Sequence, residues 1–349
     1  MPSQIVVYIY FMRIGFAYNV KHDQGQGMKR ELDFDSPETI EAIIKTIEGL
    51  GHRTERMEAD SRAFEKLNDL RDKIDLVFNI AEGLSGDARE SQIPLFCEML
   101  KIPYTHSSPT THAIKLRKNL TKLVVTGVGV KVPGSMLAQA GDVVKLPRGW
   151  DWPVIIKPNT EGSSIGVFDK NVVDNQEELN ARIGDMYAGG FEGQLLVEEF
   201  LDGREFTVAV MGNRELQVLP IIEQKFDFLP QGMRKIAGFE LKWLYEDTLT
   251  DVSQACDCPA KIDPGLETEI NETAKLVYRT LEVRDCARID FRMNSRGELY
   301  FLEINTLPGI NPDEKVISYF PLAARTAGMD FPALVKRIID LASERYGIK

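Results

Sequence analysis

Two alternating runs of residues near the carboxyl end constrain the fold of this 349-residue chain most strongly. Residues 287–293 and 298–305 each alternate apolar and polar side chains, which is the pattern of a half-buried strand. The residues between them, 294–297, read Asn-Ser-Arg-Gly and are typical of a hairpin turn. A slip of one residue would move every apolar side chain to the other face, so the pattern predicts a single register.

With the turn centred between Arg296 and Gly297, one face of the predicted hairpin is apolar and the other carries charged and amide groups. The expected apolar pairs are Ile289 with Ile304, Phe291 with Leu302, and Met293 with Tyr300. The expected polar pairs are Asp290 with Glu303, and Arg288 with Asn305.

This register places two carboxylates about 4.5–5.5 Å apart at Cβ, where like charges destabilise a sheet unless something neutralises them. A divalent cation is one such neutraliser. Asp290, Glu303 and Asn305 would offer it only hard oxygen ligands, which suits magnesium bound together with nucleotide phosphates. The alternative is a solvated sheet face on which Arg288 and Arg292 balance the acids.

The first 107 residues follow the order of a parallel α/β unit. Ser36 and Pro37 precede an apolar series at helical spacing that Gly51 closes. Residues 74–80 then form a nearly continuous apolar stretch, which predicts a buried strand followed by a ligand-facing loop. Upstream, residues 5–11 are expected to form a strand or a leader, and Met12 is a second candidate start.

A helix is predicted over residues 108–126, with Ser108 as its cap, Pro109 at its first position and Gly127 at its end. In one continuous helix Lys115, Lys118 and Lys122 would share a face. That face is either a basic wall of a site or an ordinary solvated surface.

A buried strand is predicted over residues 152–158, and its end carries Lys157. The segment 159–167 that follows is rich in glycine and hydroxyl side chains, so it is either a phosphate-binding loop or a hairpin turn. A second hairpin is expected over residues 195–208, with its turn at Asp202 and Gly203. It would bring Glu198 and Glu205 together, where they can accept hydrogen bonds from an adenine amino group and from ribose hydroxyls.

Composition narrows the class of protein. Lys and Arg total 42 against 53 Asp and Glu, a net charge of −11, which disfavours a nucleic-acid binder. The four cysteines are too few and too scattered for a disulfide framework, and no apolar run is long enough to cross a membrane. A cytoplasmic globular protein without a membrane or nucleic-acid partner is expected.

Taken together, these segments resemble the ATP-grasp superfamily, and most closely the D-alanine–D-alanine ligases, over nearly the whole chain. The matching segments, in chain order, are Val77–Asn79 with its following loop, Arg117 and Lys118 with Lys122, residues 156–158 with 161–166, residues 197–199 with 203–207, residues 288–290, and residues 302–306 with 308–309.

The resemblance implies an α/β protein of three parts with ATP held between the second and third. These parts are an N-terminal α/β domain (1–107), a central lid domain (108–197) and a C-terminal domain with the metal site (198–349). It further implies activation of a carboxylate by ATP to an acyl phosphate, attack by an amine, and release of ADP and phosphate. The family commonly forms homodimers.

Site roles also follow from the resemblance. Lys118 and Lys157 would hold ATP phosphates, and Asp290, Glu303 and Asn305 would bind two Mg²⁺ ions, with Mn²⁺ as a substitute. The implied ATP-binding set is completed by Glu161, Ser163, Ser164, Glu198, Glu199, Leu201, Glu205 and Leu302. The implied catalytic set is Arg288 and the backbone N–H of Gly309 for the oxyanion, with Ser163 and Lys242.

The chain departs from the family where the first amino acid is recognised. The usual Gly-rich segment with its glutamate is missing after the first strand, a His-Gly pair becomes Glu82-Gly83, and an aromatic hydroxyl becomes Trp243. Of the family's hydrogen-bonded trio only Ser163 is found. Glu82 is therefore expected either to bind an α-amino group or to select a more basic substrate, and Ser318 to contact the acceptor carboxylate.

D-alanine is the best single substrate prediction. Two alternatives stay open from the sequence. One is a related ligase that joins other amino acids or a secondary-metabolite carboxylate, and the other is a non-catalytic ATP-binding regulator.

Overall fold

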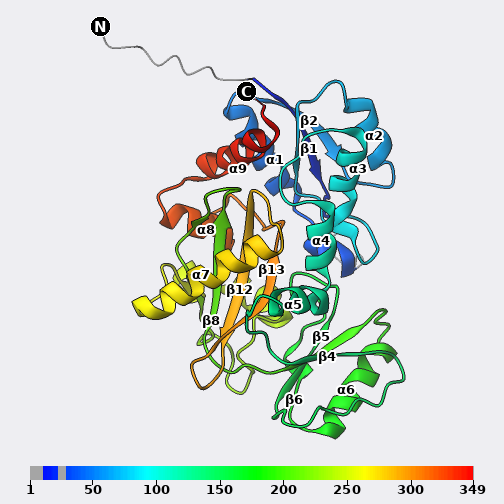
Figure 1. Cartoon of the computed structure of the whole chain (residues 1–349), viewed down its shortest axis with the longest axis vertical. Coiled ribbons are helices and arrows are strands. Elements are labelled where there is room, and N and C mark those ends of the chain that lie inside the picture. The colour runs from blue at the N-terminus through cyan, green and yellow to red at the C-terminus, as the bar shows by residue number, and fades with distance from the viewer. Residues whose placement is uncertain (1–10, 23–28, 349) are drawn as a thin grey trace.

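The computed structural model describes residues 11–22 and 29–348. The described part of the structure contains three sheets. In Figure 1 the N-terminal sheet lies at the top, the largest sheet in the middle and the central lid sheet at the bottom. Of the stretch expected as a strand or a leader, residues 5–10 lie outside the described part. Within the described ranges, no helix combines the length and apolar character needed to span a bilayer.

The N-terminal sheet is parallel, in the order β2-β1-β3, as predicted. Its strands are β1 (Arg13–Tyr18), β2 (Arg53–Glu58) and β3 (Leu76–Asn79), and its helices are α1 (Pro37–Gly49), α2 (Ala63–Leu70) and α3 (Gln92–Leu100). Ser36 caps α1 by accepting from the Thr39 N–H, and the isoleucines of α1 are buried against the sheet.

The single helix predicted over 108–126 is wrong, because two helices are present. They are α4 (Pro109–Leu116), capped by Ser108 as predicted, and α5 (Lys118–Thr126). Arg117 between them has an extended backbone, with φ −94° and ψ 95°. Because of this break, the three lysines form ion pairs with different carboxylates. Lys115 pairs with Glu90, Lys118 with Glu303 and Lys122 with Glu198.

The lid sheet is antiparallel, in the order β4-β7-β5-β6. It consists of β4 (Ser135–Ala138), β5 (Val154–Pro158), β6 (Val172–Val173) and β7 (Leu195–Glu199), and α6 (Gln176–Ala188) packs on it. The segment between β5 and β6 is a loop, so the phosphate-loop interpretation of residues 159–167 fits the structure better than a tight hairpin turn.

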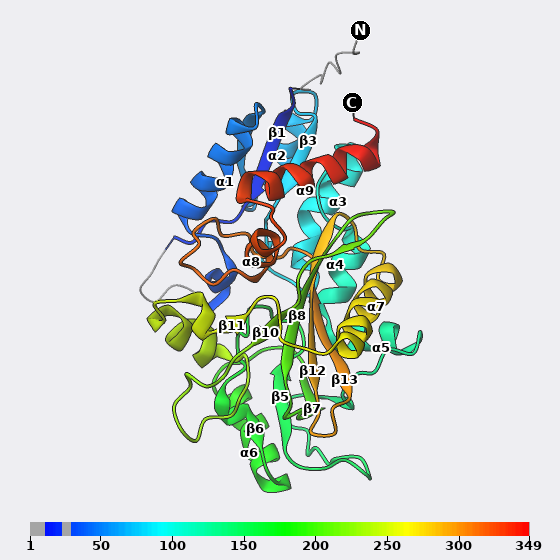
Figure 2. The ribbon, with the colours of Figure 1, turned by 90° about the vertical axis from the view of Figure 1, so that its left-hand side faces the viewer.

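The third and largest sheet has the order β11-β10-β8-β12-β13, with β9 paired to β8. Its strands are β8 (Glu205–Met211), β9 (Gln217–Val218), β10 (Ile222–Gln224), β11 (Cys256–Asp257), β12 (Cys286–Met293) and β13 (Leu299–Asn305). Helix α7 (Pro264–Thr280) covers one face. Helices α8 (Tyr319–Thr326) and α9 (Phe331–Tyr346) bring the chain back to β1 and α1, with which they share a core (Figure 2).

Short helical turns connect these elements. The 3-10 turns are Lys29–Asp33, Arg89–Ser91, Asp169–Asn171, Glu246–Thr248 and Val252–Gln254, and a π-helical turn spans Leu241–Tyr245.

The hairpin predicted over 195–208 is wrong. Strand β7 belongs to the lid sheet and β8 to the largest sheet, so residues 200–204 connect two sheets. At this connection Gly203 packs against the end of β12, where a Cβ would lie 2.6 Å from the Met293 carbonyl oxygen. Only glycine permits so close an approach. The sheets therefore diverge, and the space between them forms a pocket.

The predicted register of the β12–β13 hairpin is confirmed from Arg288 to Asp290. Arg288 faces Asn305, Ile289 faces Ile304, and Asp290 faces Glu303. Beyond Asp290 a β-bulge shifts the register, so that Phe291 faces Phe301 and Met293 faces Leu299, which corrects the predicted pairs with Leu302 and Tyr300. The bulge leaves Leu302 as an extra residue, which lines the pocket.

Candidate active site

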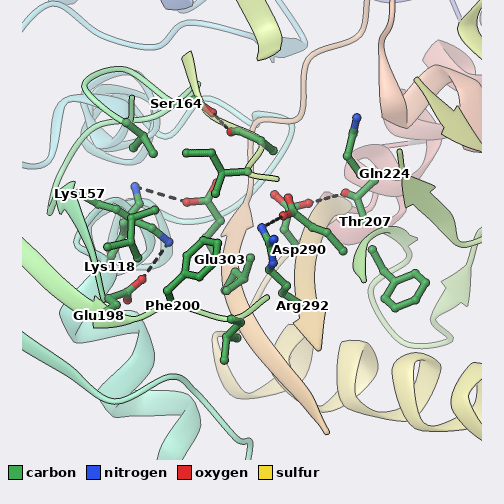
Figure 3. A pocket seen from close by; sticks show the side chains of 18 of the residues that line it. Lys118, Lys157, Ser164, Glu198, Phe200, Thr207, Gln224, Asp290, Arg292 and Glu303 are labelled. Atoms are coloured by element: carbon green, nitrogen blue, oxygen red, sulfur yellow. Dashed lines mark hydrogen bonds and ion pairs between the residues drawn. The ribbon is translucent and has the colours of Figure 1, made fainter. Parts of the chain in front are cut away.

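A pocket between the lid sheet and the largest sheet gathers most of the predicted site residues (Figure 3). The predicted residues that line it are Lys118, Lys157, Glu161, Ser164, Glu198, Glu199, Leu201, Glu205, Lys242, Arg288, Asp290, Leu302 and Glu303. Residues from five strands, from helix α5 and from the segments between the strands converge there, although they lie between positions 118 and 303 of the sequence.

Glu198 forms two buried ion pairs, one 2.7 Å from Lys122 Nζ and one 2.9 Å from Lys157 Nζ. The predicted contact of Glu198 with adenine is thus accompanied by an unpredicted role, in which its carboxylate holds two lysines at the pocket wall. Burial by itself would raise the pKa of Glu198, but the two ammonium groups outweigh it and bring the pKa to about 2.

The low pKa of Glu198 predicts acid sensitivity. A carboxylate with a depressed pKa stabilises the fold above its unfolded pKa near 4.5, and this contribution is lost as the pH falls toward 2. A shift of this size corresponds to roughly 3 kcal/mol. We expect urea unfolding curves to show that the free energy of unfolding decreases from pH 4.5 to 2.5. In the Glu198→Gln variant this free energy should decrease less steeply with pH. An equal slope in parent and variant would contradict this assignment.

Lys118 begins α5 and points into the same space. Its Nζ lies 3.4 Å from Glu303 Oε2 and donates a hydrogen bond to the Glu161 carbonyl. Its backbone N–H donates to the Asn159 carbonyl at 3.0 Å, which ties the start of α5 to the loop after β5. Lys118 and Lys157 therefore lie on the lid side of the pocket, facing the acids of β12 and β13 (Figure 3).

The predicted acidic pair is present, and its charges are balanced. Arg288 donates two hydrogen bonds of 3.1 Å to Asp290, Thr207 donates to Asp290, and Asn305 Nδ2 lies 3.4 Å from Asp290 Oδ2. Burial raises the pKa of Glu303, but Lys118 and Lys242 foremost lower it to about 2. Glu303 is thus held ionised among cations, and Asp290 is bound by the Arg288 guanidinium, which suits a polyphosphate and metal site.

The alternative in which Arg288 and Arg292 balance the acids is partly correct. Arg288 forms an ion pair with Asp290, whereas the Arg292 guanidinium lies 2.7 Å from the Glu205 carboxylate. The Arg292 guanidinium lies over the rings of Phe200 and Phe226, 5.3 and 5.5 Å from their centroids. Apolar side chains complete this end of the pocket: Ile155, Phe200, Leu201, Phe206, Ile236 and Leu302. Such a slot beside a buried carboxylate suits a flat base.

The loop after β5 contacts the segment after β10. Ser164 donates to the Ala237 carbonyl at 2.6 Å, and Trp243 Nε1 donates to the Ser163 carbonyl at 3.2 Å. Both serines have positive φ, 45° and 60°, so the loop is held in a tight left-handed conformation. The predicted mobile segment 223–250 thus closes against the predicted phosphate loop.

The N-terminal domain contributes residues that sequence reasoning missed. Asp33, in the 3-10 turn Lys29–Asp33, is buried beside Ser163, and Arg89 lies 3.9 Å from it and 3.3 Å from Glu161. Burial raises the pKa of Asp33, while Ser163 and Arg89 partly offset this. Among the residues that the structure describes, none forms a hydrogen bond with its Oδ1. Asp33 therefore places a carboxyl group beside Ser163.

Glu82, the predicted first-substrate contact, lies in the same cluster. Burial raises its pKa well above the ordinary value, and the nearby Glu90 and Asp33 raise it further. Glu90 is occupied by Lys115 and lies 3.7 Å from His112. A cation bound near Glu82 and Asp33 would offset the repulsion that Asp33 exerts on Glu82.

The predicted residues Gly309 and Ser318 lie next to each other, and Arg288 contacts Tyr319, the residue after Ser318. Ser318 Oγ donates to the Gly309 carbonyl at 3.1 Å and accepts from the Asn311 N–H at 3.2 Å. Arg288 lies between Asp290 and the ring of Tyr319, whose centroid is 5.7 Å away. Ser318 is therefore tied to Gly309, and Arg288 contacts the ring of the next residue along the chain, Tyr319.

Comparisons with known proteins agree with this geometry. The sequence model of the family described as D-ala D-ala ligase C-terminus matches residues 132–340. The D-alanine–D-alanine ligase of Desulforudis audaxviator is 36% identical over 275 residues, covering 78% of this chain and 82% of that protein. The uncharacterized protein y4sG of Sinorhizobium fredii is 31% identical over 312 residues, 88% of each chain.

Among solved structures, D-alanine–D-alanine ligase from Bacillus anthracis complexed with ATP superposes with a TM-score of 0.70 at 19% identity, over 96% of this chain and 99% of that one. This likeness confirms the predicted ATP-grasp fold. With the family model covering more than half of the sequence, the chain belongs to the D-alanine–D-alanine ligase family.

Proposed function

We propose that this chain is an ATP-dependent carboxylate–amine ligase that forms a dipeptide, with D-alanine plus D-alanine as the first substrate pair to test. The observation that carries the proposal is one pocket in which Lys118 and Lys157 face Asp290 and Glu303. Cations on one wall and acidic side chains that can hold a metal ion on the other are the arrangement that a nucleotide polyphosphate needs.

In the first step, a carboxylate oxygen of the acyl substrate attacks the γ-phosphorus of ATP, and ADP leaves. Lys118 and Lys157 hold the phosphates in line and offset the charge on the leaving ADP. The base occupies the apolar slot at Phe200 and Leu302, with Glu205 beside it.

In the second step, the amine of the acceptor attacks the acyl carbon, the C–O bond to phosphate breaks, and an amine proton is lost. Arg288 and the Gly309 N–H offer donors to the oxyanion of the tetrahedral intermediate. Because an acyl phosphate hydrolyses readily, water must be excluded. The contacts of Ser163 with Trp243 and of Ser164 with Ala237 link the two loops that cover the pocket.

Two Mg²⁺ ions, replaceable by Mn²⁺, fit the donors present. The described residues hold no group of three or more His, Cys, Asp or Glu side chains arranged for a metal ion, since the set here is two carboxylates and an amide. Mg²⁺ commonly keeps waters and takes one or two carboxylates plus substrate phosphates. Asp290, Glu303 and Asn305 would hold it, and it would neutralise phosphate charge.

Asp33 is proposed to bind the α-amino group of the acyl substrate together with Glu82. Asp33→Asn removes the charge at nearly constant volume, and loss of a charge-assisted hydrogen bond costs about 1.5–3 kcal/mol. We expect the KM for the acyl amino acid to rise roughly ten- to hundred-fold while the KM for ATP changes little. The control is Asp60→Asn, outside the pocket. An equal rise in both KM values would contradict this role.

A second candidate function is the ligation of other amino acids or of a secondary-metabolite carboxylate. The observation that favours it is the acidic pair Asp33 and Glu82 with Trp243 beside Ser163. Membership of a ligase family removes the support for the regulator hypothesis.

The deciding experiment measures phosphate release from Mg-ATP with D-alanine, then with pools of D- and L-amino acids, and identifies products by mass. Release with D-alanine alone and a D-alanyl dipeptide product would support a role in peptidoglycan precursor synthesis in the cytoplasm. Turnover only with another acid or amine would support the second candidate, and the absence of turnover with every pool would overturn both. Sedimentation would test the expected homodimer.

A further inference from the structure

Arg89 connects the N-terminal domain to the loop of residues 159–167, here called the phosphate loop. Its side chain is 13% exposed, and its guanidinium donates to the Thr160 carbonyl at 3.0 Å and to the Glu161 carboxylate at 3.3 Å. The same guanidinium lies 3.9 Å from Asp33 Oδ2. One planar group thus contacts both the proposed acyl-substrate site and the loop proposed to cover the phosphates of ATP.

The backbone of Arg89 is packed beside the proposed acyl-substrate site. Gly83, which directly follows Glu82, has φ +79°, and a Cβ on it would lie 2.2 Å from the Arg89 carbonyl oxygen. Glycine is required there, because no side chain fits so close to another backbone. The Gly83 N–H donates to Asn19 Oδ1 at 2.9 Å, which ties this turn to the residue after β1. Glu82 and Arg89 are therefore held together through Gly83.

The phosphate loop in turn contacts the ATP-binding residues. The Glu161 carbonyl accepts from Lys118 Nζ, and the same Nζ lies 3.4 Å from Glu303 Oε2. The Asn159 carbonyl accepts from the Lys118 N–H at 3.0 Å. A displacement of residues 159–161 would therefore change where the Lys118 ammonium lies relative to Glu303.

Binding of the acyl substrate would change the charge that Arg89 faces. Asp33 is proposed to bind the α-ammonium group, and it also lies within ion-pair distance of Arg89. An ammonium group at Asp33 would offset its charge and repel the guanidinium, so that Arg89 favours its two partners on the phosphate loop. The loop would then be held more firmly when the acyl substrate is present, which is positive coupling between the two substrates.

We propose that Arg89 is a positioning residue that couples the two sites, because it holds the phosphate loop over ATP when the acyl amino group is bound at Asp33. This inference rests on the proposed function. Its consequence is that the loop closes firmly only when a carboxylate is present to receive the phosphoryl group. Such coupling limits transfer of the phosphoryl group to water.

Calorimetric titration measures the coupling. The Kd of the non-hydrolysable analogue AMP-PNP with Mg²⁺ is measured with and without a saturating acyl substrate, which is D-alanine or, failing that, the amino acid that gives phosphate release. We expect the acyl substrate to lower this Kd by about five-fold or more in the parent and by less than about two-fold in Arg89→Gln. By linkage, AMP-PNP should lower the Kd of the acyl substrate by the same factor.

Two further variants separate positioning from structure. Arg89→Lys keeps the charge but cannot contact Thr160 and Glu161 with one planar fork, so it should restore the coupling only in part. Arg62→Gln removes an ion pair with Glu65 in the same domain, between side chains that are 70% and 65% exposed. The coupling in this control should stay at the parental value.

The outcomes are distinct for the inference and for the proposed function. Dipeptide formation without coupling in the parent overturns the inference and leaves the proposed function intact. If Arg89→Gln raises the Kd of AMP-PNP equally with and without the acyl substrate, the coupling is unchanged, Arg89 is structural and the inference fails. The absence of phosphate release with every amino acid overturns the proposed function and this inference with it.

Discussion

Glu303→Gln is expected to abolish turnover while leaving ADP binding mostly intact. Glu303 faces Asp290 across β12 and β13, and its charge lies among Lys118, Lys242 and Arg288. The substitution keeps the shape of the side chain and removes one of the two carboxylates that would hold magnesium. A loss of several kcal/mol of charge stabilisation corresponds to roughly a thousand-fold in rate. Phosphate release and calorimetric titration with ADP provide the two measurements.

A matched control lies on the same hairpin. Glu298 is near the turn, where it pairs with Lys131 away from the pocket, so Glu298→Gln should keep near-parental turnover. The magnesium dependence of the residual rate adds a second measurement, since the variant should need more Mg²⁺ for half-maximal activity. Turnover near the parental rate in Glu303→Gln would show that the metal assignment is wrong.

The hairpin that carries Glu303 shows what the sequence predicts well. Strict alternation defined the strands and placed Asp290 opposite Glu303, because a wrong register would have exposed the apolar face. The bulge at Leu302 could not be predicted, since an extra residue is tolerated wherever its side chain finds another apolar surface, and the nucleotide pocket offers one.

The errors arise where tertiary contacts overrule local pattern. The break at Arg117 lets Lys118 and Lys122 reach carboxylates on different strands, and no local breaker such as proline marks it. Likewise, Asp202-Gly203 is a good turn sequence, but the glycine serves a close approach to Met293 between two sheets. Asp33 lies in a short 3-10 turn without a motif, so only the structure brings it to Ser163.

The largest expected effect on stability is that of Asp285→Asn. Asp285 is fully buried, and it accepts from the His106 N–H at 2.7 Å, from Asn213 Nδ2 at 2.9 Å and from Arg345 at 2.8 Å. These partners lie in the N-terminal domain, after β8 and on α9, so one carboxylate connects three segments of the chain. Asparagine would leave the guanidinium of Arg345 without its counter-charge and turn a donor toward other donors.

Breaking one partner of a buried ion pair costs about 3–5 kcal/mol, whereas an exposed substitution changes stability by less than about 0.5 kcal/mol. Urea unfolding followed by far-UV circular dichroism should show this difference between Asp285→Asn and Asp72→Asn, whose side chain is 91% exposed. Because the penalty comes from the charge left behind, the double variant with Arg345→Gln should be less destabilised than the sum of the single variants. Additive losses would mean that the ion pair does not link Asp285, directly before β12, to Arg345 on α9.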